Sequence, residues 1–372
     1  MANIINYAES ELSDFNRKPF HSVDSLIFSK FSYIGLSSFE PGFEPGKTLP
    51  TIGSLLKAEH FREMFSHVWD EENSLRLLFA MAASPRYRNL TLGFYREEQD
   101  CILEKQFSAV TIFLNEDTAY IAFRGTDATL VGWKEDFNMA FKYPVPSQEE
   151  AVRYVEEVAA NFKGKLLLGG HSKGGNLAVY VYAKLNRQLK DRIVKVYSHD
   201  GPGFKENALD ALELENSQKI VEKTVPQSSV IGMLLESQEQ FSIVKSNRTG
   251  LLQHDPFSWV VEGDHFVFVE RLTKNAKYMD KSLHNWLEAV SDEEREHFVN
   301  ALYSVLDTGD TQNIKQIGSE WQRNIPLMMG RVRNLDEDSR FLIHKMLKTM
   351  ASSALKSITE KGGVIDSFNG LK

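Results

Sequence analysis

The pattern of apolar and polar positions divides the chain into three parts. Early in the chain, apolar side chains recur at helical spacing in Asp24–Phe31 and Glu72–Ala83, which predicts two amphipathic helices. Further along, short runs of β-branched and aromatic residues alternate with helical stretches, as in an α/β fold with a mostly parallel sheet. We therefore expect a mainly helical N-terminal segment over 1–90, an α/β core over 91–274 and a helical C-terminal extension over 275–372.

Apolar runs within the expected core predict individual strands. Phe107–Leu114 and Ala119–Phe123 flank the turn-forming segment Asn115-Glu116-Asp117, which predicts an antiparallel hairpin at a sheet edge. Leu166-Leu167-Leu168 predicts a buried strand, and apolar spacing from Lys173 through Leu185 predicts the helix that follows it. Three more strands are expected over Ile193–Tyr197, Ile220–Val225 and Phe241–Val244.

Two capping boxes mark expected helix starts. The first, Ser147-Gln148-Glu149-Glu150, precedes a helix whose expected core residues are Val152, Val155, Val158, Ala159 and Phe162. The second, Ser291-Asp292-Glu293-Glu294, lies in the C-terminal extension, where Asp336–Leu355 predicts a long terminal helix. By contrast, Ser37–Gly53 is rich in glycine and proline and predicts an ordered loop with little regular structure.

Composition limits the class of protein. Hydrophobic residues at 42% and charged residues at 25% are typical of a soluble globular chain. The formal net charge of -8 argues against nucleic acid as a partner, because binding to phosphates uses surplus Lys and Arg. The single cysteine, Cys101, rules out an intramolecular disulfide and fits a reducing compartment. Met1–Phe15 lacks the charge pattern of a secretory signal, and no apolar run approaches the ~20 residues of a membrane span. We expect a cytoplasmic protein without a transmembrane segment.

Metal and cofactor motifs are missing from the sequence. It contains no H-E-x-x-H, paired-cysteine or EF-hand motif, so we expect neither a metal nor a cofactor. Asn247-Arg248-Thr249 matches a glycosylation sequon, a match that we interpret as coincidental without a secretory signal. The sequence does not indicate an oligomeric state.

Ser172 is the main candidate for a catalytic nucleophile. It lies in Gly170-His171-Ser172-Lys173-Gly174, between a predicted strand and a predicted helix. A nucleophile elbow needs this order, with glycines where other side chains would collide and a helix that directs backbone N–H groups at the reacting centre. The arrangement predicts a serine hydrolase of α/β-hydrolase fold. The alternative, a glycine-rich phosphate-binding turn, lacks the Gly-Lys-Ser/Thr ending. We expect the side chain of Lys173 to point to the pocket rim or solvent.

The acid and the base of a Ser-His-Asp triad follow the serine along the chain in this fold. Asp200 comes directly after a predicted strand, although an aspartate before Gly-Pro can also simply form a turn. His254 lies in a loop before Asp255-Pro256, whereas His265 resembles a strand start. We favour His254 as the base and keep His265 as the alternative. For His199 we expect a packing role, because adjacent side chains on an extended segment point in opposite directions.

Two motifs together resemble a known family. Ala122-Phe123-Arg124-Gly125-Thr126, followed by Gly-Gly-His-Ser-Lys-Gly-Gly-Asn at 169–176, is similar to the fungal-type class 3 lipases, in which F-R-G-T precedes G-H-S-x-G. The alternative is that Phe123–Thr126 is a strand end with one surface arginine. Four further segments are similar to a bacterial family of uncharacterised α/β-hydrolase-like proteins related to those lipases: Asn3–Tyr7, Val23–Ile27, His199–Phe204 and Gln253–Trp259.

The resemblance implies an oxyanion hole and a place for the acid. In the fungal-type lipases the residue after the F-R-G glycine contributes to the oxyanion hole, and that position is Thr126 here. The backbone N–H of Lys173 would be the second donor. Those lipases carry the acid after the following strand, where this chain has Pro226-Gln227-Ser228-Ser229 and no carboxylate. Asp200-Gly201-Pro202-Gly203-Phe204 instead resembles the acid-bearing D-P-A-G-P-x-F stretch of pancreatic-type lipases, which favours Asp200.

These residues predict acyl transfer on a small-molecule ester, and the resemblance to lipases implies an acyl or lipid chain. Ser172 would attack the carbonyl with His254 as general base, Asp200 would orient the imidazole, and water would hydrolyse the acyl-enzyme. Val230–Leu235 and Leu251-Leu252 are candidates for an acyl pocket or lid, although such runs are more often core. The alternative is a non-catalytic α/β-hydrolase fold that acts as a binding or regulatory module.

Overall fold

The computed structural model describes most of the first three quarters of the chain. The described residues are 1–43, 48–127, 130–139, 142–204, 209, 219–229, 231–233 and 240–273, with the single residues 276, 291, 293, 296, 337 and 340 beyond them. Nearly all of the helical extension expected over 275–372, including the two helices predicted there, lies outside the described residues. The same holds for about half of Val230–Leu235.

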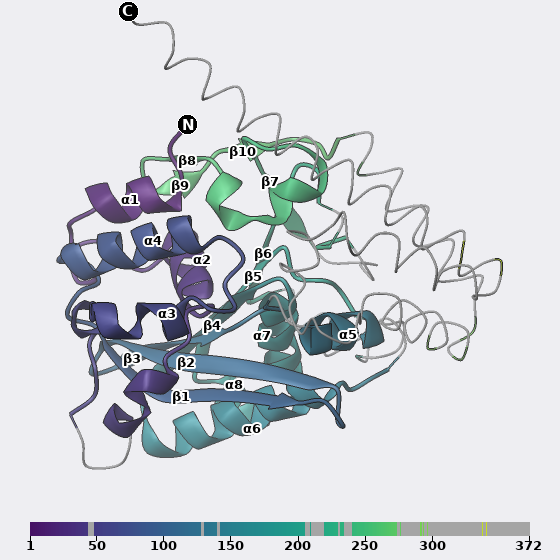
Figure 1. The fold of residues 1–372 in the computed structure, drawn as a ribbon, viewed down its shortest axis with the longest axis horizontal. Coiled ribbons are helices and arrows are strands. Elements are labelled where there is room, and N and C mark those ends of the chain that lie inside the picture. The colour runs from purple at the N-terminus through teal and green to yellow at the C-terminus, as the bar shows by residue number, and fades with distance from the viewer. Residues whose placement is uncertain are drawn as a thin grey trace, which may run out of the picture.

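An eight-stranded sheet forms the centre of the described part (Figure 1), in the order β1-β2-β3-β4-β5-β6-β7-β10. Strands β3 to β7 pair in parallel, and the pairs β1–β2, β2–β3 and β7–β10 are antiparallel. The strands are β1 Thr91–Asp100, β2 Lys105–Asn115, β3 Thr118–Phe123, β4 Lys165–His171, β5 Ile193–His199, β6 Val221–Pro226, β7 Phe241–Val244 and β10 Phe268–Val269. A separate two-stranded sheet pairs β8 (Val261–Glu262) with β9 (His265–Phe266).

The predicted hairpin forms as β2 and β3, but its place at the sheet edge is wrong. β1, which was not predicted, pairs with the outer side of β2 and forms that edge of the described sheet. The second half of β1, Arg96–Asp100, is polar throughout, so it lacks the apolar run used to recognise a strand. Its arginine instead pairs with two glutamates of the neighbouring helix, Glu150 and Glu157.

Helices cover both faces of the sheet (Figure 1). The N-terminal helices share one core with the sheet, and α6 and α7 share the other. The helices are α1 Ile4–Ser10, α2 Ser22–Phe31, α3 Phe61–Met64, α4 Glu71–Ala83, α5 Leu130–Asn138, α6 Pro146–Asn161, α7 Lys173–Lys184 and α8 Arg187–Lys190, and the 3-10 turns are η1 Ser37–Gly42, η2 Ile52–Leu55, η3 Ala58–His60, η4 Gly250–His254 and η5 Pro256–Ser258.

Strand β3 shows why the central strands are apolar throughout. Tyr120 and Ala122 belong to the core shared with the N-terminal helices, whereas Ile121 and Phe123 belong to the core shared with α6 and α7. Because successive side chains of a strand point to opposite faces, a strand covered on both faces needs apolar residues at every position. The same holds for Leu166-Leu167-Leu168 in β4, which confirms the predicted buried strand.

Helix α6 begins one residue before the predicted capping box. Pro146 occupies its first turn, where the missing N–H of proline costs nothing. The N-cap is Val145 rather than the predicted Ser147, and the side-chain oxygen of Gln148, rather than of Glu150, accepts the N-cap backbone N–H at 3.1 Å. Val155 and Val158, two of the predicted core residues, are fully buried.

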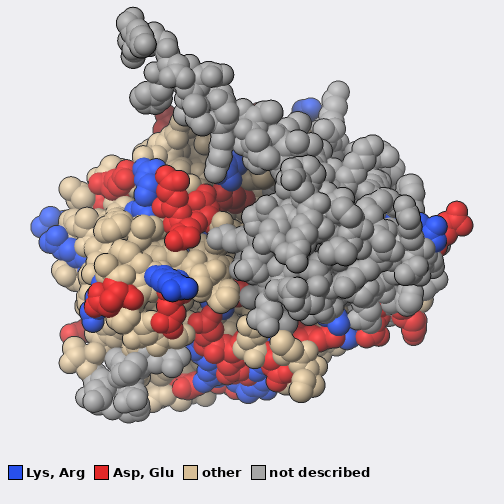
Figure 2. All heavy atoms as spheres, in the orientation of Figure 1, with Lys and Arg blue, Asp and Glu red and all other residues tan. Residues whose placement is uncertain are grey.

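Charged side chains of both signs are mixed on the visible surface. On the face shown in Figure 2, Lys and Arg lie among Asp and Glu. Within the part of the chain that the structure describes, no helix is long and apolar enough to cross a membrane.

Candidate active site

Three polar side chains meet beyond the carboxyl ends of β4 and β5. Ser172 directly follows β4, Asp200 directly follows β5, and His254 is the last residue of η4. Neighbouring parallel strands end at the same edge of a sheet, and the loops that follow them therefore lie together. The fold brings residues far apart in sequence to one place.

His254 contacts both of the other residues. Its Nε2 lies 3.0 Å from Oγ of Ser172, and its Nδ1 lies 2.6 Å from Oδ2 of Asp200. Asp200 is 0% exposed, whereas the His254 side chain is 29% exposed. Because the carboxylate only accepts, it holds the proton on Nδ1 and leaves Nε2 free to accept from the serine hydroxyl. This is the contact order that activates a nucleophile through a base.

The backbone of Ser172 has the conformation of a nucleophile elbow. Its φ of 58° and ψ of −131° lie in a region that non-glycine residues rarely adopt. The turn depends on close backbone contacts, since a Cβ at Gly174 would lie 2.1 Å from the carbonyl oxygen of Phe123. Helix α7 begins at the next residue, Lys173. Strand, elbow and helix, within a mostly parallel sheet covered on both faces, give the chain the α/β-hydrolase fold that the sequence predicts.

Asp200 is held by donors from the loop after β6. Its Oδ1 accepts the hydroxyl of Ser229 at 2.5 Å and the backbone N–H of Gly232 at 3.1 Å. Both carboxylate oxygens therefore have partners, as a fully buried charge requires. Asp200 also has a positive φ of 51°, so two adjacent strands are each followed by a non-glycine residue with positive φ.

Neither the His265 ring nor the His199 ring bonds to Ser172, although the backbone oxygen of His199 accepts the N–H of Ser172 at 2.9 Å. The side chain of His265 is 63% exposed and contacts Asp264 at 3.3 Å. His199 points to the opposite side from Asp200, with Nδ1 2.7 Å from Oγ1 of Thr224 and Nε2 2.9 Å from Oγ of Ser25. Burial lowers the pKa of His199 to about 3, so its ring stays neutral. The predicted packing role of His199 is confirmed.

Thr126 lies just beyond the end of β3, the strand next to β4. Its side chain is buried, and its hydroxyl donates a hydrogen bond to the Asp136 carboxylate on α5. Burial raises the pKa of Asp136 to about 6, although the positive charge of Lys173 and the Thr126 bond act in the opposite direction. The side chain of Thr126, the residue expected at the oxyanion hole, is thus fixed by its bond to Asp136.

Arg124 is buried, so the alternative of a strand end with a surface arginine is wrong. Its Nη2 lies 2.6 Å from Oε1 of Glu97 and 3.5 Å from Oδ2 of Asp127. The Glu97 carboxylate is on β1, so this ion pair joins the β3 end to a strand two places away. The pair fixes the segment that leads to Thr126.

The side chain of Lys173 is buried, and the prediction that it points to the rim or solvent is wrong. Its Nζ lies 2.9 Å from Oε2 of Glu135 and 2.7 Å from both the backbone oxygen and Oε1 of Gln106. Both members of the Lys173–Glu135 pair are 0% exposed. Glu135 also accepts the backbone N–H groups of Gln106 and Ser147, each at 3.0 Å. The lysine charge is tolerated in the interior because it pairs with a carboxylate that is itself hydrogen-bonded.

The sequence analysis missed two residues, His171 and Tyr33, that hold the backbone of His254 in place. The Nε2 of His171 lies 2.8 Å from the backbone oxygen of His254, and its Nδ1 lies 3.0 Å from the hydroxyl of Tyr33. His171 belongs to the pentapeptide around Ser172, so its place beside the candidate nucleophile could have marked it as a residue of the site. Tyr33 lies in the N-terminal segment, where nothing in the sequence marks it.

Among the described residues, no group of three or more His, Cys, Asp or Glu side chains could hold a metal ion. The Asp200 carboxylate beside His254 accepts hydrogen bonds from His254, Ser229 and Gly232. Its surroundings suit the orientation of an imidazole.

Comparison with solved structures finds fungal lipases. A mutant form of MDLA from Penicillium cyclopium is 11% identical with a TM-score of 0.38, over 61% of this chain and 78% of that chain. A Rhizomucor miehei lipase propeptide complex is 14% identical with a TM-score of 0.37, over 61% and 68%. Lipase II from Rhizopus niveus is 14% identical with a TM-score of 0.35, over 61% and 83%. Comparison with curated proteins gives no match.

A family model matches a long segment of the chain. The model describes the Mbeg1-like proteins, and the match covers residues 81–304. This segment begins inside α4, contains the whole eight-stranded sheet, and includes Ser172, Asp200 and His254. As the match extends over more than half of the sequence, the chain belongs to the Mbeg1-like family.

Proposed function

We propose that this protein is a serine hydrolase that cleaves a carboxylic ester of a small molecule or lipid. Ser172 is the nucleophile, His254 the general base and Asp200 the orienting acid. The observation that carries the proposal is the continuous contact from Oγ of Ser172 to Nε2 of His254 at 3.0 Å and from Nδ1 of His254 to Asp200 at 2.6 Å. A structural serine has no need of a buried carboxylate aligned behind its histidine partner.

The reaction proceeds through an acyl-enzyme. His254 takes the hydroxyl proton of Ser172 as its oxygen attacks the ester carbonyl, and the resulting imidazolium is stabilised by Asp200. The imidazolium then gives that proton to the leaving alcohol as the carbon–oxygen bond breaks. A water molecule, deprotonated by the same histidine, hydrolyses the acyl-enzyme and restores the serine.

Backbone N–H groups of Thr126 and Lys173 form the proposed oxyanion hole. Preorganised donors stabilise the developing negative charge because they need no reorganisation during the reaction. Two features support this pair. The side chain of Thr126 is anchored on Asp136, and that of Lys173 is anchored on Glu135 and Gln106. The side-chain contacts of each residue therefore fix the position of its backbone N–H.

The substrate class and the compartment are part of the proposal. The resemblance of the F-R-G-T and G-H-S-x-G segments to lipases favours carboxylic esters, with an acyl or lipid chain on the acid side. Cys101 is the single cysteine of the chain and is exposed, which fits a reducing compartment such as the cytoplasm.

A fluorophosphonate probe and a series of p-nitrophenyl esters test this proposal. We expect covalent labelling of the folded wild-type chain at Ser172, loss of labelling in Ser172→Ala, and ester turnover with a definite acyl-chain optimum. The chain-length optimum separates a short-chain esterase from a lipase. Neither labelling nor turnover in a well-folded sample would contradict the proposal and favour a binding or regulatory module on the same fold.

A further inference from the structure

We infer that Tyr33 is a positioning residue of this site, and that the N-terminal segment before residue 81 therefore completes a hydrolase centre whose other residues lie within the family match. The inference rests on the proposed function. It concerns how the proposed base, His254, is held in place.

Tyr33 lies where three parts of the site come together. It follows α2 closely, and its buried hydroxyl lies 3.0 Å from Nδ1 of His171, with a longer contact of 3.4 Å to the backbone oxygen of the same residue. The same hydroxyl occupies the space beside Gly125, where a Cβ would lie 2.1 Å from it. One side chain of the N-terminal segment thus contacts both the elbow and the segment before Thr126.

The ring of His171 passes this contact on to His254. Its Nε2 lies 2.8 Å from the backbone oxygen of His254, and the two imidazole rings are 4.5 Å apart. A carbonyl oxygen only accepts, so Nε2 of His171 must carry the hydrogen. Burial and the nearby positive charges lower the pKa of His171 well below its usual value, and the neutral ring has a bare Nδ1. Tyr33 must then be the donor to Nδ1.

The direction of these bonds gives Tyr33 its role. Its O–H donates to Nδ1 of His171, and Nε2–H of His171 donates to the carbonyl of His254. Without the tyrosine hydroxyl, His171 can take the other tautomer, which turns a lone pair toward the His254 carbonyl. That repulsion would move the base relative to Oγ of Ser172, and a displacement of about 1 Å can cost on the order of 10²-fold in rate.

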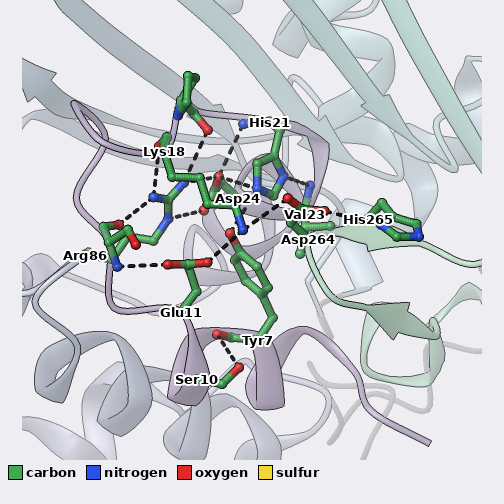
Figure 3. A network of polar contacts seen from close by, with 12 residues as sticks. Tyr7, Ser10, Glu11, Lys18, His21, Val23, Asp24, Arg86, Asp264 and His265 are labelled. Carbon is green, nitrogen blue, oxygen red and sulfur yellow. Dashed lines mark hydrogen bonds and ion pairs between the residues drawn. The ribbon is translucent and has the colours of Figure 1, made fainter.

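The helix before Tyr33 is itself fixed to the body of the protein. At its first turn, fully buried Asp24 accepts the Arg86 guanidinium at 2.9 and 2.7 Å (Figure 3). Asp24 also accepts the Tyr87 hydroxyl at 2.7 Å. One residue later, Oγ of Ser25 lies 2.9 Å from Nε2 of His199, the neighbour of Asp200. Helix α2 and Tyr33 just after it therefore contact residues on both the acid side and the base side of the site.

A second link joins the segment before α2 to the chain between β7 and β10. Lys18 pairs with Glu11 at 2.7 Å and with Asp264 of the β8–β9 turn at 3.1 Å (Figure 3). His254 and Asp264 flank the same short stretch of chain. The N-terminal segment thus holds this stretch from two directions, at Tyr33 and at Lys18.

The test uses Tyr33→Phe in the full chain, with Tyr154→Phe as the matched control. Tyr154 is equally buried, and its hydroxyl has one partner, Oγ1 of Thr111 at 2.9 Å, in the other core. We expect Tyr33→Phe to lower kcat and the rate of fluorophosphonate labelling about 10- to 100-fold at unchanged KM. Tyr154→Phe should lose comparable thermal stability and keep both rates. In a His254→Ala background, Tyr33→Phe should cause no further loss, because it acts through that base.

Histidine-ring ¹⁵N NMR tests the relay without relying on activity. The His171 signals, assigned with His171→Asn, should show a protonated Nε2 and a bare Nδ1 in the wild type and an altered tautomer balance in Tyr33→Phe. A wild-type His171 protonated at Nδ1 would overturn the inference whether or not the protein is a hydrolase. So would wild-type labelling in Tyr33→Phe. A wild type that does not label, with the expected tautomer, would refute the proposed function and leave the relay itself standing.

Discussion

The hydroxyl of Ser229 donates a hydrogen bond to Oδ1 of Asp200 at 2.5 Å, so the loop after β6 contacts the carboxylate that follows β5. In the fungal-type lipases that the sequence resembles, the acid itself follows the later strand. Here that loop carries no carboxylate and supplies two donors, Ser229 and the backbone N–H of Gly232. In the proposed triad the acid therefore follows a different strand, and the loop after β6 holds its carboxylate.

Replacing the acid or its donor should affect turnover to different extents. Asp200→Asn places an amide against Nδ1 of His254 and favours the wrong tautomer, so we expect kcat to fall on the order of 10³- to 10⁴-fold. Ser229→Ala removes one hydrogen bond to a buried charge and should cost about 10- to 100-fold. Steady-state kinetics with a p-nitrophenyl ester measure both, with circular dichroism to verify folding. Equal activity in Asp200→Asn and wild type would exclude Asp200 as the acid.

The two downstream histidines provide a matched pair. His254→Ala removes the group that contacts both Ser172 and Asp200, so we expect turnover to fall at least 10³-fold. His265→Ala changes an exposed side chain whose ring contacts Asp264, and turnover should stay within about twofold of wild type. Ester hydrolysis and probe labelling are the measurements. The reverse ranking would make His265 the base.

The buried Lys173–Glu135 pair should show strong coupling in stability. Lys173→Met leaves the Glu135 carboxylate buried without its cation, which we expect to cost about 3–5 kcal/mol of unfolding free energy. The double variant Lys173→Met/Glu135→Gln removes both charges and should lose less than the sum of the single variants. Urea denaturation of the four proteins completes the cycle. Additive losses would mean that the two charges do not stabilise each other.

Asp136 should make stability fall with rising pH. Burial raises its pKa to about 6, so the folded state binds its proton more tightly than the unfolded chain does. The resulting cost grows between about pH 4 and 6 and is complete above that range. Asp136→Asn cannot ionise, so it should melt at a higher temperature than wild type at pH 8 and at a similar temperature at pH 4. The exposed Asp117→Asn is the control, and identical differences at both pH values would contradict the expectation.

His199 should contribute to acid unfolding. Its pKa of about 3 in the folded state lies below the ordinary value of about 6.5, so the unfolded chain binds a proton first as the pH falls. Stability from this group is complete above about pH 6.5 and is lost progressively toward pH 3. His199→Gln should be less stable at pH 7.5, because it loses the fit to Ser25 and Thr224, yet its melting temperature should fall less steeply below pH 6. Parallel curves would show that other groups control acid unfolding.

The sequence was sufficient where local features determine the structure. The strand, the elbow at Ser172 and helix α7 follow one another directly, and each has its own signal: apolar residues, glycines and helical spacing. The order of nucleophile, acid and base along the chain also led to Asp200 and His254, which lie together in the structure. Here the constraint is the topology of the fold rather than any local pattern.

Contacts between distant residues could not be predicted. The side chain of Lys173 is buried because it pairs with Glu135. That partner lies 38 positions away in sequence, and no periodicity predicts it. Tyr33 and His171 are 138 positions apart. Strand β1 escaped notice for a related reason, since Arg96 is satisfied by Glu150 on another element rather than by an apolar environment. In each case a polar residue is explained only by the residue that it meets in three dimensions.

The strained backbone of Ser172 makes the most stable residue at this position different from the one that the proposed reaction needs. At φ 58° and ψ −131° a glycine would be the relaxed choice, and Ser172→Gly would keep the turn while removing the strain. A screen that selects only for variants that survive heating would therefore tend to enrich glycine at this position and discard the hydroxyl of the proposed nucleophile. Directed evolution of a more robust form of this chain needs an activity readout at every round.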